Sequence, residues 1–292
     1  KKEITKIRIR EIKIEIKKGD PKALGKLAEV LSEHNKYRKD IKEANDYLTK
    51  AARLYDINAR IDLKNLKELK LLQSNDCDLM FNHAAKIEDE DLERSKFWYK
   101  KAADLGNEES MVTYAKILDR QVSENLREFQ KYRTSNMSKE EYENAKIEAE
   151  YYFKKAADIG NVVGMSNYAR ILDHKVRDYQ KASANHRRTK ITEQESKLLQ
   201  KESAKYFKKA ADSGSRVAMN SYGVYLEYKS KERSQEEAKK WYKKSADLGY
   251  IKGMLNYSRI LDQGIRDYRY ALRNKKKTKM TKTKYEEAQK EA

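Results

Sequence analysis

The sequence has little of what most folds use to reverse direction or to link distant segments. It contains one proline and 10 glycines among 292 residues. Turns between β-strands rely on both residue types, so this scarcity argues against an all-β fold. Cys77 is the only cysteine. A disulfide framework within the chain is therefore excluded, and a reducing compartment, the cytoplasm or the nucleus, fits best.

Long apolar runs are missing as well, because no stretch approaches the roughly 18 apolar residues of a membrane helix. Charge is plentiful: 66 Lys and Arg stand against 47 Asp and Glu, which gives a net charge of +19. Charged residues make up 39% of the chain and hydrophobic residues 38%. This balance is typical of helices with narrow apolar stripes, so we expect an all-α protein without a membrane span.

Two short phrases recur along the chain. The first reads WYKKAADLGN from Trp98, YFKKAADIGN from Tyr152, YFKKAADSGS from Tyr206 and WYKKSADLGY from Trp241, with a weaker copy from Tyr47. The second follows four of these copies and reads MVTYAKILD from Met111, MSNYARILD from Met165, MNSYGVYLE from Met219 and MLNYSRILD from Met254. Repetition of this kind indicates an array of similar structural units.

Both phrases predict helices. Met165, Tyr168, Ala169 and Leu172 follow the i, i+3, i+4, i+7 spacing of a buried helical stripe. In the first phrase the aromatic pair and the alanines share one face, and the closing glycine suits a helix end in the left-handed conformation. Neither helix can bury its face alone. We therefore expect helical hairpins that stack on one another.

The alternation of [WY]-[YF]-K-K-A-A-D-x-G with an alanine-centred helix resembles the Sel1-like repeat, a relative of the tetratricopeptide repeat. The resemblance covers about residues 20–262. It implies a right-handed α-solenoid of stacked helix-turn-helix hairpins that binds other proteins and has neither a catalytic centre nor a cofactor. The chain departs from the family in one respect, because long charged insertions replace the short glycine-rich loop between the two helices.

The spacing of the phrases reveals long and short repeats. Trp98 to Tyr152 and Tyr152 to Tyr206 each span 54 residues, whereas Tyr206 to Trp241 spans 35. The 19 extra residues continue the apolar stripe, through Val122, Leu126, Phe129, Tyr142 and Ile147 in one copy and Val176, Tyr179, Leu198 and Leu199 in the other. Shared between two helices, they would lengthen each by roughly 14 Å. We expect elongated hairpins that project from the array with this stripe buried.

The phrases divide the chain into seven segments. They are 1–19, the end of a preceding degenerate repeat; 20–56, repeat 1; 57–106, an irregular repeat 2; 107–160 and 161–214, long repeats 3 and 4; 215–249, compact repeat 5; and 250–292, a partial long repeat 6. Segment 57–106 is either one swollen repeat or a repeat and a half. The near identity of ILDHKVRDYQKA from Ile171 and ILDQGIRDYRYA from Ile260 places the next aromatic pair at 295, so we expect the natural chain to continue past both ends.

The sequence carries no catalytic signal. Its glycines occur singly at predicted helix ends, and its histidines, His34, His83, His174 and His186, lack metal-ligand spacing. His83 takes a place that other copies give to tyrosine, which predicts a core or boundary histidine. Cys77 lacks a partner that would activate it, so we expect a buried thiol. We interpret the chain as a non-enzyme without metal or cofactor.

Basic residues gather where each long hairpin should turn. The candidate docking residues are Lys131, Arg133, Arg187, Arg188, Lys190, Lys275, Lys276, Lys277 and Lys279. Arg133, Arg187 and Lys276 share one position relative to the ILD phrase, so parallel hairpins would align them in a row of positive tips. Two interpretations stand. The lysines solubilise exposed helix ends, or the tips form a docking ridge for an acidic partner.

The resemblance favours an adaptor whose concave face grips a segment of another protein. The alternative is a structural component docked through its basic tips on an acidic polymer, with the tails of tubulin in microtubules as one candidate, at a cytoskeletal or ciliary location. Nucleic acid is less favoured, since no binding motif is present and the tyrosines occupy core positions. Exposed Tyr and Asn on the concave face would favour the adaptor. Loss of binding on neutralising the tips would favour the polymer.

Overall fold

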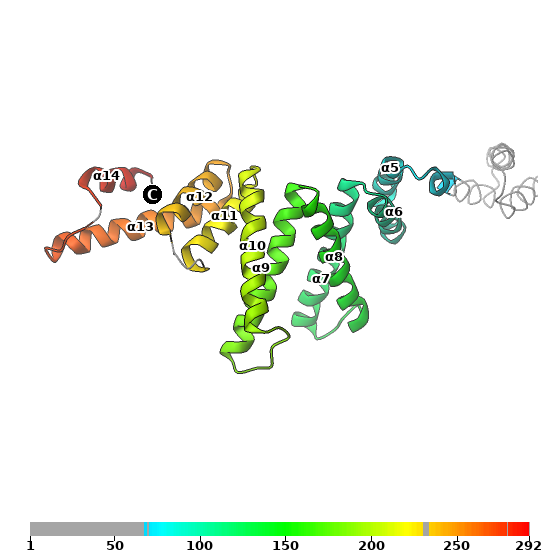
Figure 1. Ribbon diagram of the computed structural model, residues 1–292, viewed down its shortest axis with the longest axis horizontal. Coiled ribbons are helices and arrows are strands. Elements are labelled where there is room, and N and C mark those ends of the chain that lie inside the picture. Colours follow the sequence, from blue (N-terminus) through cyan, green and yellow to red (C-terminus); the bar gives the residue numbers. More distant parts are fainter. Residues whose placement is uncertain (1–66, 69, 230–233, 279, 292) are drawn as a thin grey trace, which may run out of the picture. The chain divides into compact units, whose positions relative to one another are not determined.

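The computed structural model describes residues 67, 68, 70–229, 234–278 and 280–291. The predicted segments 1–19 and 20–56, and most of the helix expected over 57–72, lie outside the described residues. The described residues form helices and no strand, as predicted (Figure 1). The chain divides into two units, Lys1–Asn107 and Glu108–Ala292, each of which is described by itself.

Among its described residues, the first unit holds the hairpin made of α5 (Cys77–Ile87) and α6 (Leu92–Asp104). The carboxylates of Asp76 and Asp91 cap the two helices by accepting hydrogen bonds from backbone N–H groups of the first turn. Inside the hairpin the buried Ser95 hydroxyl donates to the Ala84 carbonyl over 2.9 Å. The helices predicted over 75–87 and 91–105 are confirmed to within two residues at each end.

The second unit holds the long repeats. Its helices are α7 (Glu108–Tyr132), α8 (Lys139–Asp158), α9 (Val162–Ala184), α10 (Glu193–Asp212), α11 (Arg216–Val224) with a π-helical turn η1 (Tyr225–Lys229), α12 (Gln235–Asp247), α13 (Ile251–Arg273) and α14 (Lys282–Glu291). Each helix packs mainly on its neighbours in chain order. Successive hairpins therefore stack as repeats, and no core is shared by distant segments.

Local signals set where the helices begin and end. Ser138 starts α8 and Thr192 starts α10 with the same capping box, in which Glu141 and Glu195 bond back to the cap backbone. Each first phrase ends at a glycine with positive φ, between +75° and +104°: Gly106, Gly160, Gly214 and Gly249. Glycine adopts this conformation without the steric cost that a Cβ brings.

The phrases supply the core, as their spacing predicts. The buried side chains include Trp98, Tyr99, Tyr152, Phe153, Tyr206, Phe207 and Tyr242 from the first phrase and Met111, Tyr114, Met165, Tyr168, Met219, Tyr222 and Tyr257 from the second. Met254 is an exception, since it is 46% exposed. The residue before the methionine is small, which lets the two helices of neighbouring phrases cross closely. At Gly164, for example, an added Cβ would lie 2.7 Å from the Cβ of Ala156.

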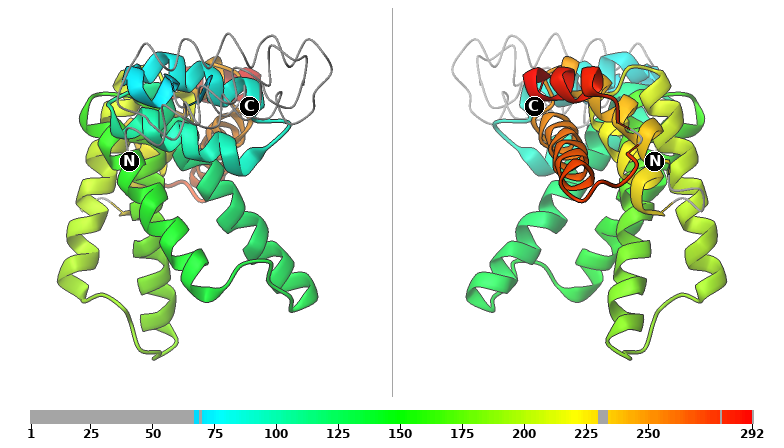
Figure 2. Two further views of the ribbon diagram at one scale, coloured as in Figure 1. Left: turned by 90° about the vertical axis from the view of Figure 1, so that its right-hand side faces the viewer. Right: turned by 90° about the vertical axis from the view of Figure 1, so that its left-hand side faces the viewer.

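The long repeats form elongated hairpins, as expected. We call the outer parts of the α7–α8, α9–α10 and α13–α14 hairpins, beyond the phrases, the first, second and third arm. Helices α7 and α9 have 25 and 23 residues, whereas α11 has 9 before η1. The first two arms project to the same side of this unit and diverge toward their tips, while α13 runs in a different direction (Figures 1 and 2).

The prediction that the whole apolar stripe of the arms is buried is wrong. Leu126, Phe129, Ile147 and Leu198 are 44–65% exposed. Val176 is buried as expected, and smaller residues, Ala145 and Ser196, are buried on the returning helices. Because the first two arms diverge, the large apolar side chains near their outer ends lose the facing helix that would cover them.

Candidate binding surfaces

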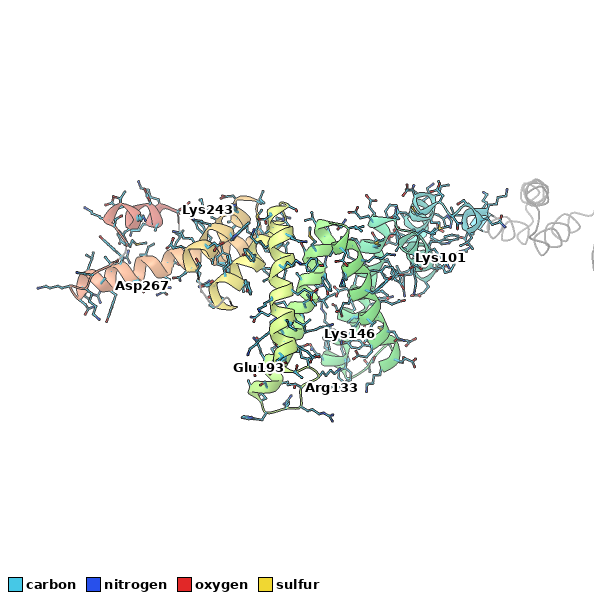
Figure 3. The ribbon with its side chains drawn as sticks, viewed as in Figure 1. Lys101, Arg133, Lys146, Glu193, Lys243 and Asp267 are labelled. Carbon is cyan, nitrogen blue, oxygen red and sulfur yellow. The ribbon has the colours of Figure 1, made fainter. Side chains whose placement is uncertain are left out.

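The predicted basic residues lie at the outer ends of the arms. Lys131 belongs to the last turn of α7 and Arg133 follows it, Arg187, Arg188 and Lys190 lie in the turn between α9 and α10, and Lys275, Lys276 and Lys277 follow α13. All eight are exposed, and Lys279 lies outside the described residues. Figure 3 shows Arg133 at the outer end of the first arm. The tips of the first two arms lie on one side of the unit, and the third tip does not join them (Figures 1 and 2).

The turn after each arm's first helix holds a non-glycine residue with positive φ, a conformation that the sequence analysis did not predict. His186 and Lys275 both have φ of 52°, in the left-handed region. Behind them the N–H of Arg187 bonds to the Ala182 carbonyl, and that of Lys276 to the Ala271 carbonyl, each over 2.8 Å. This is the hydrogen-bond pattern that ends a helix at glycine. A side chain there costs about 1 kcal/mol.

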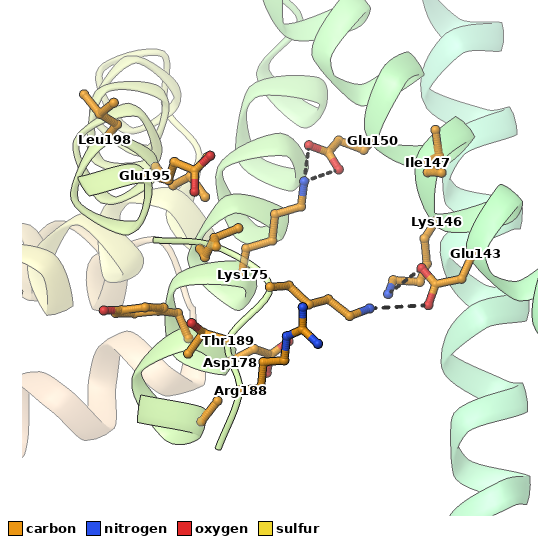
Figure 4. Close-up of a pocket in the computed structure, with 15 residues that line it drawn as sticks. Glu143, Lys146, Ile147, Glu150, Lys175, Asp178, Arg188, Thr189, Glu195 and Leu198 are labelled. Carbon is orange, nitrogen blue, oxygen red and sulfur yellow. Dashed lines mark hydrogen bonds and ion pairs between the residues drawn. The ribbon is translucent and has the colours of Figure 1, made fainter. Parts of the chain in front are cut away.

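A groove of about 730 Å³ separates the first arm from the second (Figure 4). Its walls come from α8, from the outer half of α9, from the turn after α9 and from α10. The apolar lining residues are Ile147, Tyr179, Ala182, Ile191, Leu198 and Leu199. Arg188 and Lys190, two of the predicted docking residues, also line it. The arm residues that sequence analysis wrongly placed in the core thus form the floor of a groove.

Ion pairs cross this groove between the two arms. Lys175 on α9 contacts both carboxylate oxygens of Glu150 on α8 at 2.6 Å. Lys190, in the turn after α9, approaches Glu143 on α8 at 4.0 Å. Figure 4 shows both pairs spanning the space between the arms. They set the separation of the walls at two places, so the groove is present without a partner.

A second set of ion pairs ties two of the repeats to the repeat before them. The Arg170 guanidinium donates to Asp119 of the preceding repeat over 2.7 Å, and that of Arg259 donates to Glu227 over 2.6 Å. Both arginines stand five residues after the methionine of their phrase, and both acids stand eight residues after it. Val224 occupies the arginine position in the compact repeat, so this contact is missing between α9 and α11.

A smaller groove of about 330 Å³ lies at that interrupted step. It is lined by residues of α9, α10, α11 and the start of α13, among them Asp173, Arg177, Val224, Tyr225, Tyr250 and Lys252. Asp173 pairs with Arg177 on its own helix at 3.2 Å. The sequence holds a signal for this site. Val224 is the one uncharged residue at a position of the second phrase that Lys116, Arg170 and Arg259 fill in the other copies.

Buried tyrosines donate hydrogen bonds to carboxylates in each long repeat. Tyr114 bonds to Glu148 over 2.7 Å, Tyr168 to Glu202 over 3.1 Å and Tyr257 to Glu291 over 2.8 Å. The partners stand 34 residues apart in all three pairs, a periodicity that the sequence analysis overlooked. Burial, together with the hydrogen bond to Glu291, raises the pKa of Tyr257 to about 12. These contacts belong to the repeat framework.

The other singled-out residues have structural surroundings. The His83 ring nitrogen lies 2.8 Å from a Glu68 carboxylate oxygen, and the ring meets that of Trp98 edge-on, so His83 is a boundary residue as predicted. Cys77 is half-buried, which corrects the expectation of a buried thiol, because it starts α5 beside solvent. Burial and the Asp78 carboxylate raise the pKa of its thiol. That shift disfavours a reactive thiolate.

The described residues include neither a group of side chains suited to a metal ion nor a helix suited to crossing a membrane. Within residues 67–291, apart from their undescribed gaps, no three His, Cys, Asp or Glu side chains are grouped to hold a metal ion. Among the described helices, none combines the length and apolar character that a membrane crossing requires.

The sequence matches the family model of the Sel1 repeat over residues 22–56, 87–107, 144–161, 200–215 and 216–250. The chain is a Sel1-repeat protein. The matched segments include the KKAADxG phrases, and the arms fall largely in the unmatched stretches between them. Sel1 repeats indicate a helical solenoid that serves as a protein-interaction scaffold. The family matches thus fall mainly on the repeated phrases, whereas the long insertions lie largely outside the matched segments.

Solved structures with similar chains carry the same repeat. One is a Sel1 repeat protein from Oxalobacter formigenes, with 16% identity and a TM-score of 0.42 over 83% of this chain and 78% of that chain. Another is a protective antigen of uropathogenic Escherichia coli that displays an SLR fold, with 17% identity and a TM-score of 0.23 over 88% of this chain and 60% of that chain. No curated protein matches the sequence.

Proposed function

We propose that this protein is a non-catalytic adaptor that holds a segment of a partner protein in the groove at the α9–α11 step. One observation carries the proposal: the ion pair that joins neighbouring repeats at Arg170 and Arg259 is replaced at Val224 by a groove of about 330 Å³. At this step the space that an arginine side chain takes up elsewhere is left open to another molecule.

The lining of this groove suits a peptide segment. Tyr225 and Tyr250 are only half-buried and offer aromatic faces with a hydroxyl, the side-chain type enriched at protein interfaces. Lys252 is exposed at the rim and Arg177 lies nearby, so a carboxylate on the bound segment would meet positive charge. Tyrosine at the inter-repeat groove is the feature that distinguishes the adaptor from the polymer-docking hypothesis.

The test replaces Val224 by arginine. Val224→Arg supplies the residue that pairs with the preceding repeat elsewhere, so it should bond to Asp173 and fill the groove without unfolding the chain. Wild type and variant are immobilised to capture partners from the cells of origin, and the affinity of each captured, purified partner is then measured. Arg120→Gln, at an exposed position of α7 that lines neither groove, is the matched control. The proposal requires partner binding that V224R loses and R120Q keeps.

The alternative, docking on an acidic polymer such as a microtubule, has one observation in its favour. The tips of the first two arms lie on the same side of their unit with exposed basic side chains (Figures 1 and 2). Its test is co-sedimentation with microtubules at low and moderate salt, because such attraction is screened by ions. The variant carries glutamine at Arg187, Arg188, Lys190, Lys275, Lys276 and Lys277. The alternative requires that the parent pellets and the variant does not.

A further inference from the structure

The groove between the first and second arms is a binding site in its own right. We propose that it receives an amphipathic, acidic helix of a partner protein. This site is distinct from the α9–α11 groove, because its walls are α8, the turn after α9, and the outer parts of α9 and α10. It therefore adds a second docking surface to the adaptor and does not depend on the first.

The apolar floor lacks a partner within the described residues. Ile147 and Leu198 are 64% and 65% exposed, although both continue the apolar stripe of their helices. Leucine and isoleucine gain about 25 cal/mol per Å² when their apolar surface leaves water. A contiguous exposed apolar surface with a charged rim is the usual mark of an interaction site on a soluble protein.

The groove is already open before anything binds. The Lys175–Glu150 and Lys190–Glu143 contacts span it, and Glu143 also meets Lys146 of its own helix at 3.4 Å. Ile147 and Leu198, which lie on opposite sides of this space in Figure 4, remain largely exposed beside these contacts. A preformed groove binds more tightly than one that must first be ordered, because less conformational entropy is lost on association.

The walls select a helix over an extended strand. Helices α8, α9 and α10 satisfy their backbone N–H and C=O groups internally, so they offer no backbone groups to a strand laid beside them. An extended peptide on this floor would lose water from its own backbone without gaining partners. A helix carries its backbone hydrogen bonds with it and presents an apolar stripe to the groove.

The charge at the outer end selects an acidic helix. Arg188 lines the groove and makes no ion pair with any described residue, and Lys190 is 88% exposed with its carboxylate partner at 4.0 Å. Arg187 adds a third cation at the same turn. A second copy of this chain would bring another net charge of +19, and repulsion between like charges opposes that occupant. Carboxylates on the partner's helix would meet Arg188 and Arg187 and the exposed ammonium group of Lys190.

A displayed library of 16-residue helix-forming peptides, randomised at every surface position, tests the proposal on the full chain. Selected peptides are synthesised, and their dissociation constants are measured against wild type and three variants. The double variant Ile147→Glu with Leu198→Glu removes the apolar floor. Arg188→Glu inverts the unpaired charge. Leu255→Glu is the control, because Leu255 is also 65% exposed but lies on α13. Circular dichroism and urea unfolding confirm that each variant is folded.

The proposal expects selected peptides with negative net charge and an apolar stripe at helical spacing. It expects the double variant to weaken their binding at least about tenfold, as loss of an interface hot spot does. R188E should weaken binding by a smaller factor, about threefold to fivefold, and L255E should leave it unchanged. Three results would each overturn the proposal: no selected peptide carries an acidic stripe, the double variant binds as wild type does, or sedimentation shows a dimer that the double variant abolishes.

Discussion

The long repeat over α9–α10 and the compact repeat over α11–α12 begin with nearly the same residues and then diverge. Both bury a methionine–tyrosine stripe and aromatic side chains of the first phrase, although Trp241 of the compact repeat is only half-buried, and both close that phrase with a glycine at positive φ. The long repeat then continues its α-helix through Val176, whereas the compact one widens into a π-helical turn after Val224. The shared part packs one repeat on another, and the part that differs lines the grooves.

The comparison separates framework from binding surface. The recurring contacts, such as the serine-to-carbonyl bond of Ser203 to Ala169 at 2.8 Å, lie where the phrases lie. The exposed apolar residues Ile147 and Leu198 lie in the arms, outside the phrases. Substitutions in the phrases should therefore change stability, while substitutions in the arms should change binding.

The largest expected effect is at the closest crossing of a long repeat. A Cβ on Gly164 would lie 2.9 Å from backbone atoms of Ala156 and Ala157, which cannot move without shifting α8. Gly164→Ala should lower the free energy of unfolding by about 2–3 kcal/mol, measured by urea denaturation. Gly264→Ala is the control, because its Cβ would meet only the flexible end of Met280 at 3.0 Å. If both substitutions have equal effects, the crossing at Gly164 is not tight.

The second effect distinguishes the two kinds of repeat. Tyr168 in the long repeat donates a hydrogen bond to Glu202, whereas the equivalent Tyr222 in the compact repeat makes no hydrogen bond from its hydroxyl to any described residue. Tyr168→Phe should reduce the free energy of unfolding by about 1–2 kcal/mol, and Tyr222→Phe by less than about 0.5 kcal/mol. Urea midpoints of the two single variants give the comparison. A larger loss for Y222F would contradict it.

Alkaline pH should lower the free energy of unfolding by ionising buried tyrosines of the repeats. Burial and the Asp158 carboxylate raise the pKa of Tyr206 from 10.0 to about 12. A pKa higher in the folded state means that the neutral phenol contributes stability below pH 10, and that this stability is lost as the pH rises from 10 toward 12. The urea midpoint should fall over that window. A Tyr206→Phe, Tyr257→Phe variant should show a shallower fall, and an identical slope would exclude these two residues as the cause.

The smallest effect concerns the arm tips. His186 and Lys275 adopt a left-handed conformation that glycine occupies without steric cost. His186→Gly should raise the free energy of unfolding by up to about 1 kcal/mol. Ser183→Gly, inside the last turn of α9, is the control and should be destabilising, since glycine is a poor helix former. A loss of stability in H186G would mean that the histidine side chain makes a contact the structure does not show.

The repeated phrases made the fold predictable. Their spacing located α6 to α13, because the methionine–tyrosine stripe, the alanines and the closing glycine each have a direct physical meaning within one helix. The divergence of the first two arms was not predictable, because it depends on how two hairpins meet across a wide gap. For this reason Leu198 was expected in the core and lies in a groove.

The candidate sites were only partly predictable. Charge counting found Arg188 and Lys190 in the groove wall, but it could not show which cations already have partners. The missing ion pair at Val224 and the Tyr–Glu pairs 34 residues apart were readable from the aligned phrases. They were not predicted, because the partner of a polar residue at a repeat boundary lies on another helix and cannot be identified from one phrase alone.

The central claim is that the phrases hold the fold and the arms are additions to it. The most direct test replaces residues 174–200 of the second arm with residues 228–235, the corresponding connection of the compact repeat. Urea unfolding of this chimera is then compared with that of wild type. The account predicts a helical protein that unfolds cooperatively, with a free energy of unfolding within about 2 kcal/mol of wild type. A chimera that is unfolded, or that loses cooperativity, would show that the arms are part of the framework.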